Sequence, residues 1–116
     1  GGNPLAMSVG LEVLKLISNK TFLSKVDKTA RYFWKNLKKL ENSSNIISEV
    51  RGAGLLLGIK TNISNIDFSD QLKKNKLLNV PAADNTVRLA PPLIVSYKEI
   101  DKSLTIIKKS LKELSR

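Results

Sequence analysis

Arg88 is the residue of this sequence whose chemistry is best suited to binding an anion. It lies in the stretch "NTVRLAPPL", residues 85–93, where an apolar run ends at two prolines. A guanidinium group presents five N–H donors in a planar fork that matches the two oxygens of a carboxylate. Such charge-assisted pairs are roughly twice as strong as neutral hydrogen bonds. The residues alone leave three roles open for Arg88: a carboxylate clamp, the partner of a structural acid, or an exposed surface charge.

The composition excludes several kinds of chemistry. The chain has 116 residues, which fits one domain, and it contains neither cysteine nor histidine. Disulfides, thiolate metal sites and the Ser-His and Cys-His nucleophile pairs are therefore excluded. We expect no metal site.

The chain is strongly basic, with 20 Lys and Arg against 10 Asp and Glu and a net charge of +10. Aromatic residues make up only 5% of the sequence, too few for a base-stacking surface, so we do not expect nucleic-acid binding. A basic module that binds nucleic acid or another anion, and a structural oligomerisation domain, remain as alternatives. No apolar run approaches the ~20 residues of a membrane span, and the opening residues lack the basic region of a signal peptide. We therefore expect a cytoplasmic protein without membrane contact.

Hydrophobic spacing predicts the elements that must position Arg88. The expected helices are one that begins at Asn3-Pro4, one from Thr21 to about 41–45, one over 68–74 and one that follows the capping sequence Ser96-x-x-Glu99. The expected strands lie within 46–60, over 77–80 and over 86–90. Gly52 and Gly54 are expected to form a turn or bulge between the first two strands, and Asn75 to take a left-handed conformation.

This order of elements predicts an α/β or α+β two-layer sandwich, with a mainly antiparallel sheet covered by helices on one face. Side chains alternate across a strand. If Val87 and Leu89 face the helices, Arg88 projects from the opposite face of the sheet. The two prolines after the strand cannot continue it, so the arginine stands at a strand end.

Three stretches taken together resemble the C-terminal part of the class III pyridoxal-phosphate-dependent aminotransferases, and most of all the acetylornithine aminotransferases among them. They are "GGNPLAMSVGLEVL", "VRGAGLLLGIK" and "NVPAADNTVRLAPPLIVSYKEID", which occur in the family's order and spacing. The resemblance implies the small C-terminal domain of a fold-type I aminotransferase. Residues 1–19 would form a helix leading from the large domain, and residues 20–116 the small domain itself.

The resemblance also implies roles for individual residues. The arginine of the family's R-L-x-P-P-L stretch binds the substrate α-carboxylate, which implies that role for Arg88. Gly1, Gly2 and Asn3 match a turn near the cofactor and the dimer interface. The structural pattern R-G-x-G-L-x-x-G is matched by Arg51, Gly52, Gly54 and Gly58.

The activity implied is transfer of the δ-amino group of N-acetylornithine to 2-oxoglutarate, in arginine biosynthesis, by a pyridoxal-phosphate-dependent homodimer. Succinylornithine, succinyldiaminopimelate and ornithine remain open as amino donors. The family's cofactor-binding lysine lies upstream of the matching segment, and no lysine here has its setting. We therefore expect no catalytic residue in this chain, no binding of the cofactor by the chain alone, and no activity of the chain alone.

Overall fold

The computed structural model describes residues 20–53, 56–89 and 96–115. Its elements, in chain order, are α2 (Lys20–Ser43), β1 (Ile47–Ala53), β2 (Leu56–Thr61), α3 (Asn65–Lys74), β3 (Asn79–Ala82), β4 (Thr86–Leu89) and α4 (Tyr97–Leu114). The predicted helix that begins at Asn3-Pro4 lies outside the described residues.

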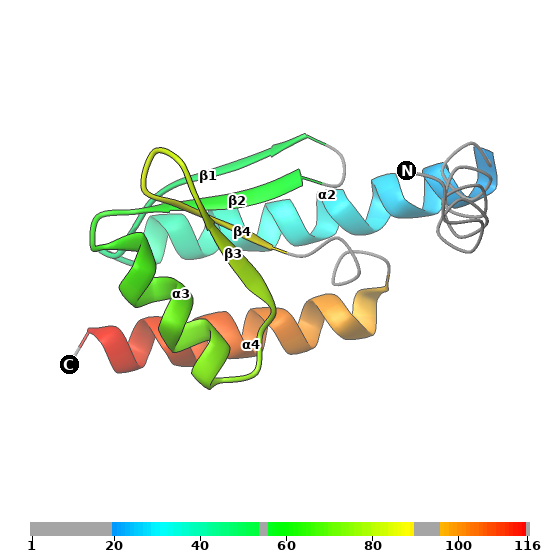
Figure 1. The fold of residues 1–116 in the computed structure, drawn as a ribbon. Helices are drawn as coiled ribbons and strands as arrows, with labels where there is room; N and C mark the ends of the chain where they lie inside the picture. Colours follow the sequence, from blue (N-terminus) through cyan, green and yellow to red (C-terminus); the bar gives the residue numbers. More distant parts are fainter. Residues whose placement is uncertain (1–19, 54–55, 90–95, 116) are drawn as a thin grey trace, which may run out of the picture.

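The four strands form one sheet in the order β1-β2-β4-β3, and all three pairs of neighbours are antiparallel. Helices α2, α3 and α4 lie on one side of this sheet (Figure 1). The predicted two-layer α/β fold is therefore confirmed. None of the described helices combines the length and the apolar character that a membrane span requires.

The core lies between the sheet and the helices. The apolar stripes predicted for α2 and α4 supply several of its largest side chains, and Phe33, Leu37, Ile100 and Ile107 are fully buried. From the sheet side, Val87 is 0% exposed and Leu89 is 3% exposed. Because side chains alternate along β4, burial of these two residues sends Arg88 to the opposite face, as predicted.

The start of α4 has the cap that its sequence indicates. The Ser96 hydroxyl accepts a hydrogen bond from the backbone N–H of Glu99 at 3.2 Å, which is the predicted N-terminal cap. The helix then continues for 18 residues to Leu114. Its apolar stripe packs against the core beside α2, so the helix is held by both its cap and its buried face.

The first strand departs from regular alternation. Alternation would place Ile46, Ser48 and Val50 on one face, but Ser48 is exposed, and Ile47 is buried together with Ile46 and Val50. The pairing with β2 shifts register between Ile47 and Glu49, and such an irregularity lets two residues occupy the place of one. The alternation of the strand is therefore broken at that point.

The end of α3 also differs. Asn75 has φ −89°, and the left-handed residue is Lys76, with φ 73°. Asn75 instead uses its side-chain amide, whose nitrogen donates to the Ser110 hydroxyl at 2.8 Å and to the Glu113 carboxylate at 2.6 Å. The helix end is thus fastened to α4, and the next residue makes the turn.

Candidate functional site

The register of the sheet places two arginines on its outer face, the face away from the helices. Gly58 in β2 pairs with Arg51 in β1 and with Arg88 in β4, and Arg88 pairs in turn with Val80 in β3. Residues that pair directly across an antiparallel sheet project to the same side. The row Arg51–Gly58–Arg88–Val80 therefore crosses the whole outer face.

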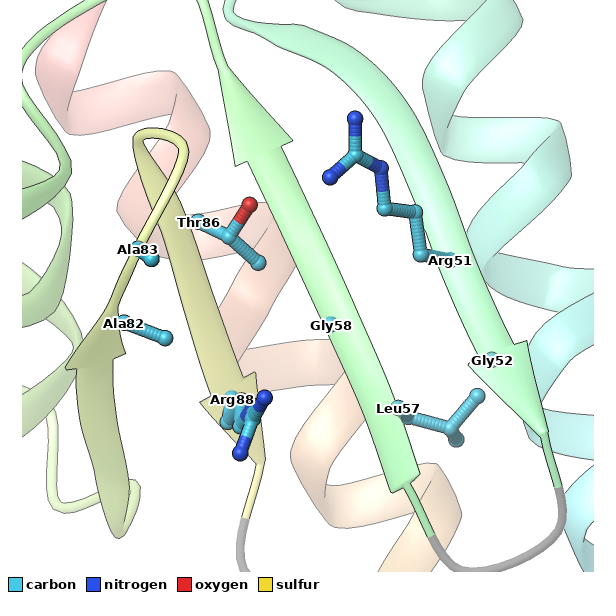
Figure 2. Close-up of a pocket in the computed structure, with 8 residues that line it drawn as sticks. All are labelled: Arg51, Gly52, Leu57, Gly58, Ala82, Ala83, Thr86 and Arg88. Atoms are coloured by element: carbon cyan, nitrogen blue, oxygen red, sulfur yellow. The ribbon is translucent and has the colours of Figure 1, made fainter.

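A hollow of about 350 Å³ opens over the part of this row from Arg51 to Arg88. Its lining residues are Arg51, Gly52, Leu57, Gly58, Ala82, Ala83, Thr86 and Arg88. Figure 2 shows the hollow from the outer face, with the helices behind the sheet and Gly58 between the two arginines. A Cβ atom at Gly58 would lie 3.0 Å from the Cγ2 atom of Thr86. The missing side chain thus keeps the floor of the hollow open.

The two arginines differ in their partners. The guanidinium of Arg51 lies 2.7 Å from an oxygen of Asp84 and 3.1 Å from an oxygen of Glu49. These hydrogen bonds, that to Asp84 first, raise the pKa of Arg51. Lys60 lies 3.3 Å from the other oxygen of Asp84. Hydrogen bonds from Arg51 and then Lys60 lower the pKa of Asp84.

Arg88 is exposed and forms no ion pair with any acidic side chain in the described part of the chain. Figure 2 shows its side chain nearly end-on, directed out of the sheet. Its backbone, in contrast, is held on both sides, since β4 pairs with β2 and β3. A cation of this kind, on a strand with two neighbours, can bind a carboxylate with little rearrangement of the backbone.

The turn between β3 and β4 is fixed by asparagine side chains. Asp84 and Asn85 both have left-handed φ values, 59° and 51°. The Asn85 amide donates to the backbone oxygens of Thr61 and Ile63, at 2.7 Å each, and its oxygen accepts from the N–H of Asn65 at 2.8 Å. This clasp fastens the start of β4 to the end of β2 and to the residues that follow it, and so sets where Arg88 stands.

The structure places the residues predicted from sequence as follows. Arg88 and Gly52 line the hollow, but Gly52 is a strand residue, paired with Leu57 near the end of β1, and not part of the turn itself. Gly54, like Gly1, Gly2 and Asn3, lies outside the described residues.

Sequence reasoning did not assign a role to Asp84. The signal available was the pair Asp84-Asn85 directly before a strand, because these residue types tolerate left-handed turns. That pattern predicts the turn, but it does not reveal that the carboxylate reaches two other strands.

The described residues do not fit a site for pyridoxal phosphate. A lysine that forms a Schiff base needs burial or a cationic neighbour to depress its pKa. No lysine with a described side chain is buried; Lys38 and Lys60 are the least exposed, and Lys60 is held by Asp84. In the described ranges there is also no group of three or more acidic side chains that could hold a metal ion.

Comparison with known proteins gives a consistent result. A family model described as aminotransferase class III matches residues 1–111. The acetylornithine aminotransferase of Agrobacterium fabrum is 39% identical over 116 residues, which cover 99% of this chain and 29% of that protein. The acetylornithine aminotransferase of Clostridium acetobutylicum is 39% identical over 113 residues, covering 97% and 29%.

Solved structures agree. That of the acetylornithine aminotransferase from Elizabethkingia anophelis superimposes with a TM-score of 0.81 at 32% identity, covering 97% of this chain and 31% of the other. Ornithine δ-aminotransferase of Plasmodium falciparum gives 0.81 at 36% identity, covering 97% and 30%.

The chain spans less than a third of the length of these relatives. The family to which they belong uses pyridoxal phosphate as its cofactor. The match of the family model covers nearly all of the sequence, and the fold agrees with it. The chain therefore belongs to the class III aminotransferases.

Proposed function

We propose that this chain is the C-terminal part of an aminotransferase that moves the δ-amino group of N-acetylornithine to 2-oxoglutarate. Residues 1–19 would lead from the large domain, and residues 20–116 would form the small domain. In this proposal Arg88 binds the α-carboxylate of the substrate. The remainder of a cytoplasmic homodimer would supply the cofactor and its lysine, with Gly1, Gly2 and Asn3 near the dimer interface.

One observation carries the role of Arg88. The outer face of the sheet presents two guanidinium groups beside one hollow, and only that of Arg88 is without an acidic partner among the described residues. An arginine that served mainly to hold the fold together would be expected to resemble Arg51, which two carboxylates engage. Support for the amino donor comes from the relatives at 39% identity, which are acetylornithine aminotransferases.

The test is steady-state kinetics of the full-length enzyme with Arg88→Gln. Loss of a hydrogen-bonded charge pair in a desolvated site costs roughly 2–5 kcal/mol, so kcat/KM for N-acetylornithine should fall at least about 30-fold. Arg88→Lys should recover only part of this loss, because an ammonium group lacks the planar fork.

Arg31→Gln is the matched control. Arg31 is exposed on α2, in the helix layer, and within the described ranges its one ion pair is with Asp27, one turn away. Its loss should change kcat/KM less than twofold. If Arg88→Gln also changed kcat/KM for N-acetylornithine less than twofold, and N-acetylornithine remained a good substrate, the role proposed for Arg88 would be wrong.

A further inference from the structure

Arg51 and Arg88 are the charged residues that line the hollow, and Arg51 is joined to three further charged side chains in one series of ion pairs. Glu49 contacts Arg51 at 3.1 Å, Arg51 contacts Asp84 at 2.7 Å, and Asp84 contacts Lys60 at 3.3 Å. Two positive and two negative charges give this series no net charge. Arg88 stands outside the series, so the net positive charge of the group resides on Arg88 alone.

Asp84 is the centre of the series because it is the one acid in it that contacts two cations. Its two oxygens engage different strands: Oδ2 faces Arg51 of β1 and Oδ1 faces Lys60 of β2. In Figure 2 the Arg51 side chain runs along β2 and away from Arg88. Asp84 thereby keeps the second guanidinium of the hollow occupied and turned aside.

Without Asp84, Arg51 would keep the contact of its Nε atom with Glu49, but its terminal NH1 group would be available to a ligand together with the guanidinium of Arg88. The strands of the two arginines are separated by β2 alone, so their backbones are two strand spacings, or roughly 10 Å, apart. Each side chain is long enough to reach toward the other over Gly58, where no side chain intervenes. A molecule with two carboxylates could then bridge the arginines.

We propose that Asp84 is a specificity-determining residue, which restricts the hollow to ligands that present a single carboxylate. This inference rests on the function proposed for Arg88. It means that a second carboxylate, such as that of 2-oxoglutarate, must be bound outside the hollow. The residue acts by occupying Arg51 and Lys60, without touching the ligand.

The test compares glutarate, a dicarboxylate, with butyrate, a monocarboxylate of similar size. Binding to the 116-residue chain is followed by NMR at the Nε–Hε resonance of Arg88, at constant ionic strength. Asp84→Asn is the informative variant, because asparagine also tolerates the left-handed conformation at φ 59° and so preserves the turn. The dispersion of the backbone amide resonances verifies the fold of each variant.

In Asp84→Asn we expect glutarate to bind about three- to fivefold more tightly than in the wild type, with butyrate changed less than twofold. Adding Arg51→Gln to this variant should remove most of the gain. Asp70→Asn, on the exposed side of α3, makes the same change in net charge away from the hollow and should change neither affinity. An unchanged ratio of glutarate to butyrate affinity in Asp84→Asn would overturn the inference.

A second variant removes the two cations that pair with Asp84 and keeps the acid itself. In Arg51→Gln/Lys60→Gln, Asp84 is left unpaired beside the hollow, and both probes should bind Arg88 about threefold more weakly. Unchanged binding of both would also contradict the inference.

Failure of the two proposals can be told apart. If the wild type shows no saturable carboxylate effect at Arg88, the carboxylate-binding role fails and the inference fails with it. If the wild type binds both probes, and the Asp84 variants bind them with the same affinities as the wild type, only the inference about Asp84 fails.

Discussion

At the scale of single residues, partners distinguish the two arginines of the outer face more than position does. Both line the same hollow and each pairs with Gly58 in the sheet, yet only the guanidinium of Arg51 contacts acids in the described part of the chain, namely Glu49 and Asp84. The sequence predicted which face Arg88 occupies, because the alternation of Val87 and Leu89 determines it. It could not predict which arginine would be neutralised, since that depends on contacts among three separate strands and a turn.

Gly58 provides a residue-scale prediction for stability. The Thr86 hydroxyl donates to the backbone oxygen of Asp84 at 3.0 Å, which fixes the rotamer that points Cγ2 at Gly58. Gly58→Ala should therefore lower the free energy of unfolding by about 1 kcal/mol, as overpacking does. Urea denaturation of the wild type and of Gly58→Ala measures this difference in the free energy of unfolding.

Thr86→Ser removes the crowding methyl group and keeps the hydroxyl. The double variant Gly58→Ala/Thr86→Ser should consequently be more stable than the sum of the two single changes predicts. Strict additivity would show that the close approach of Cγ2 is not what disfavours a side chain at position 58.

At the scale of elements, residue patterns predicted the features that depend on one helix alone. They failed for features that depend on contacts between segments far apart in the sequence. The stripes of α2 and α4 and the cap at Ser96 follow from residue types within one helix, and the structure has them. The register irregularity in β1 and the turn at Lys76 arise from pairing with β2 and from contacts with α4. The hollow also depends on contacts between distant segments, because residues of four strands and a turn line it.

The junction of α2 with β1 gives a prediction of pH dependence. Glu41 accepts a hydrogen bond from Lys38 at 3.0 Å and one from the Val50 N–H at 2.9 Å, and in that order they lower its pKa below the ordinary 4.5. A lowered folded-state pKa adds stability above pH 4.5 and loses it as pH falls through the folded value. Glu41→Gln should thus cost roughly 1 kcal/mol at pH 7 and much less well below pH 4.

Urea denaturation at pH 7 and pH 3 measures this difference. Asp70→Asn makes the same change in charge at an exposed position of α3 that forms no ion pair in the described part of the chain. An equal cost of Glu41→Gln at both pH values would mean that the carboxylate charge plays no part in fastening the helix to the strand.

The clasp around the β3–β4 turn is testable with a glycine. Asn85→Gly keeps the left-handed φ accessible and removes only the side-chain hydrogen bonds to Thr61, Ile63 and Asn65. At about 0.5–1.5 kcal/mol per bond, partly offset by water, we expect a loss of roughly 2 kcal/mol in thermal or urea unfolding. Asn85→Ala should cost more, since alanine also disfavours the left-handed conformation. Equal stability of wild type and Asn85→Gly would contradict the clasp.

At the scale of the whole molecule, the charge of +10 is spread over solvated helix faces as well as the hollow. Exposed lysines of α2 and α4 include Lys28, Lys35, Lys102 and Lys109. Part of the basic charge therefore lies on solvated helix faces, away from the hollow. The basic residue with a proposed role is an arginine on the opposite layer.

The position of this chain within its family predicts how it behaves in isolation. Mixed with pyridoxal phosphate and then reduced with borohydride, the 116-residue chain should carry only scattered, substoichiometric label on exposed lysines. Peptide mass mapping measures the label at each site. One lysine labelled stoichiometrically would show that the chain has a cofactor site of its own.

The most direct test of the account pairs a change in the enzyme with the matching change in the substrate. N-acetyl-1,4-diaminobutane is N-acetylornithine without its α-carboxylate. The full-length wild-type enzyme should prefer N-acetylornithine by a ratio of kcat/KM between roughly 30-fold and several thousand-fold. In Arg88→Gln that ratio should collapse toward one, because the group that reads the carboxylate is gone. A ratio that stays as large in Arg88→Gln as in the wild type would show that the carboxylate is bound by another residue.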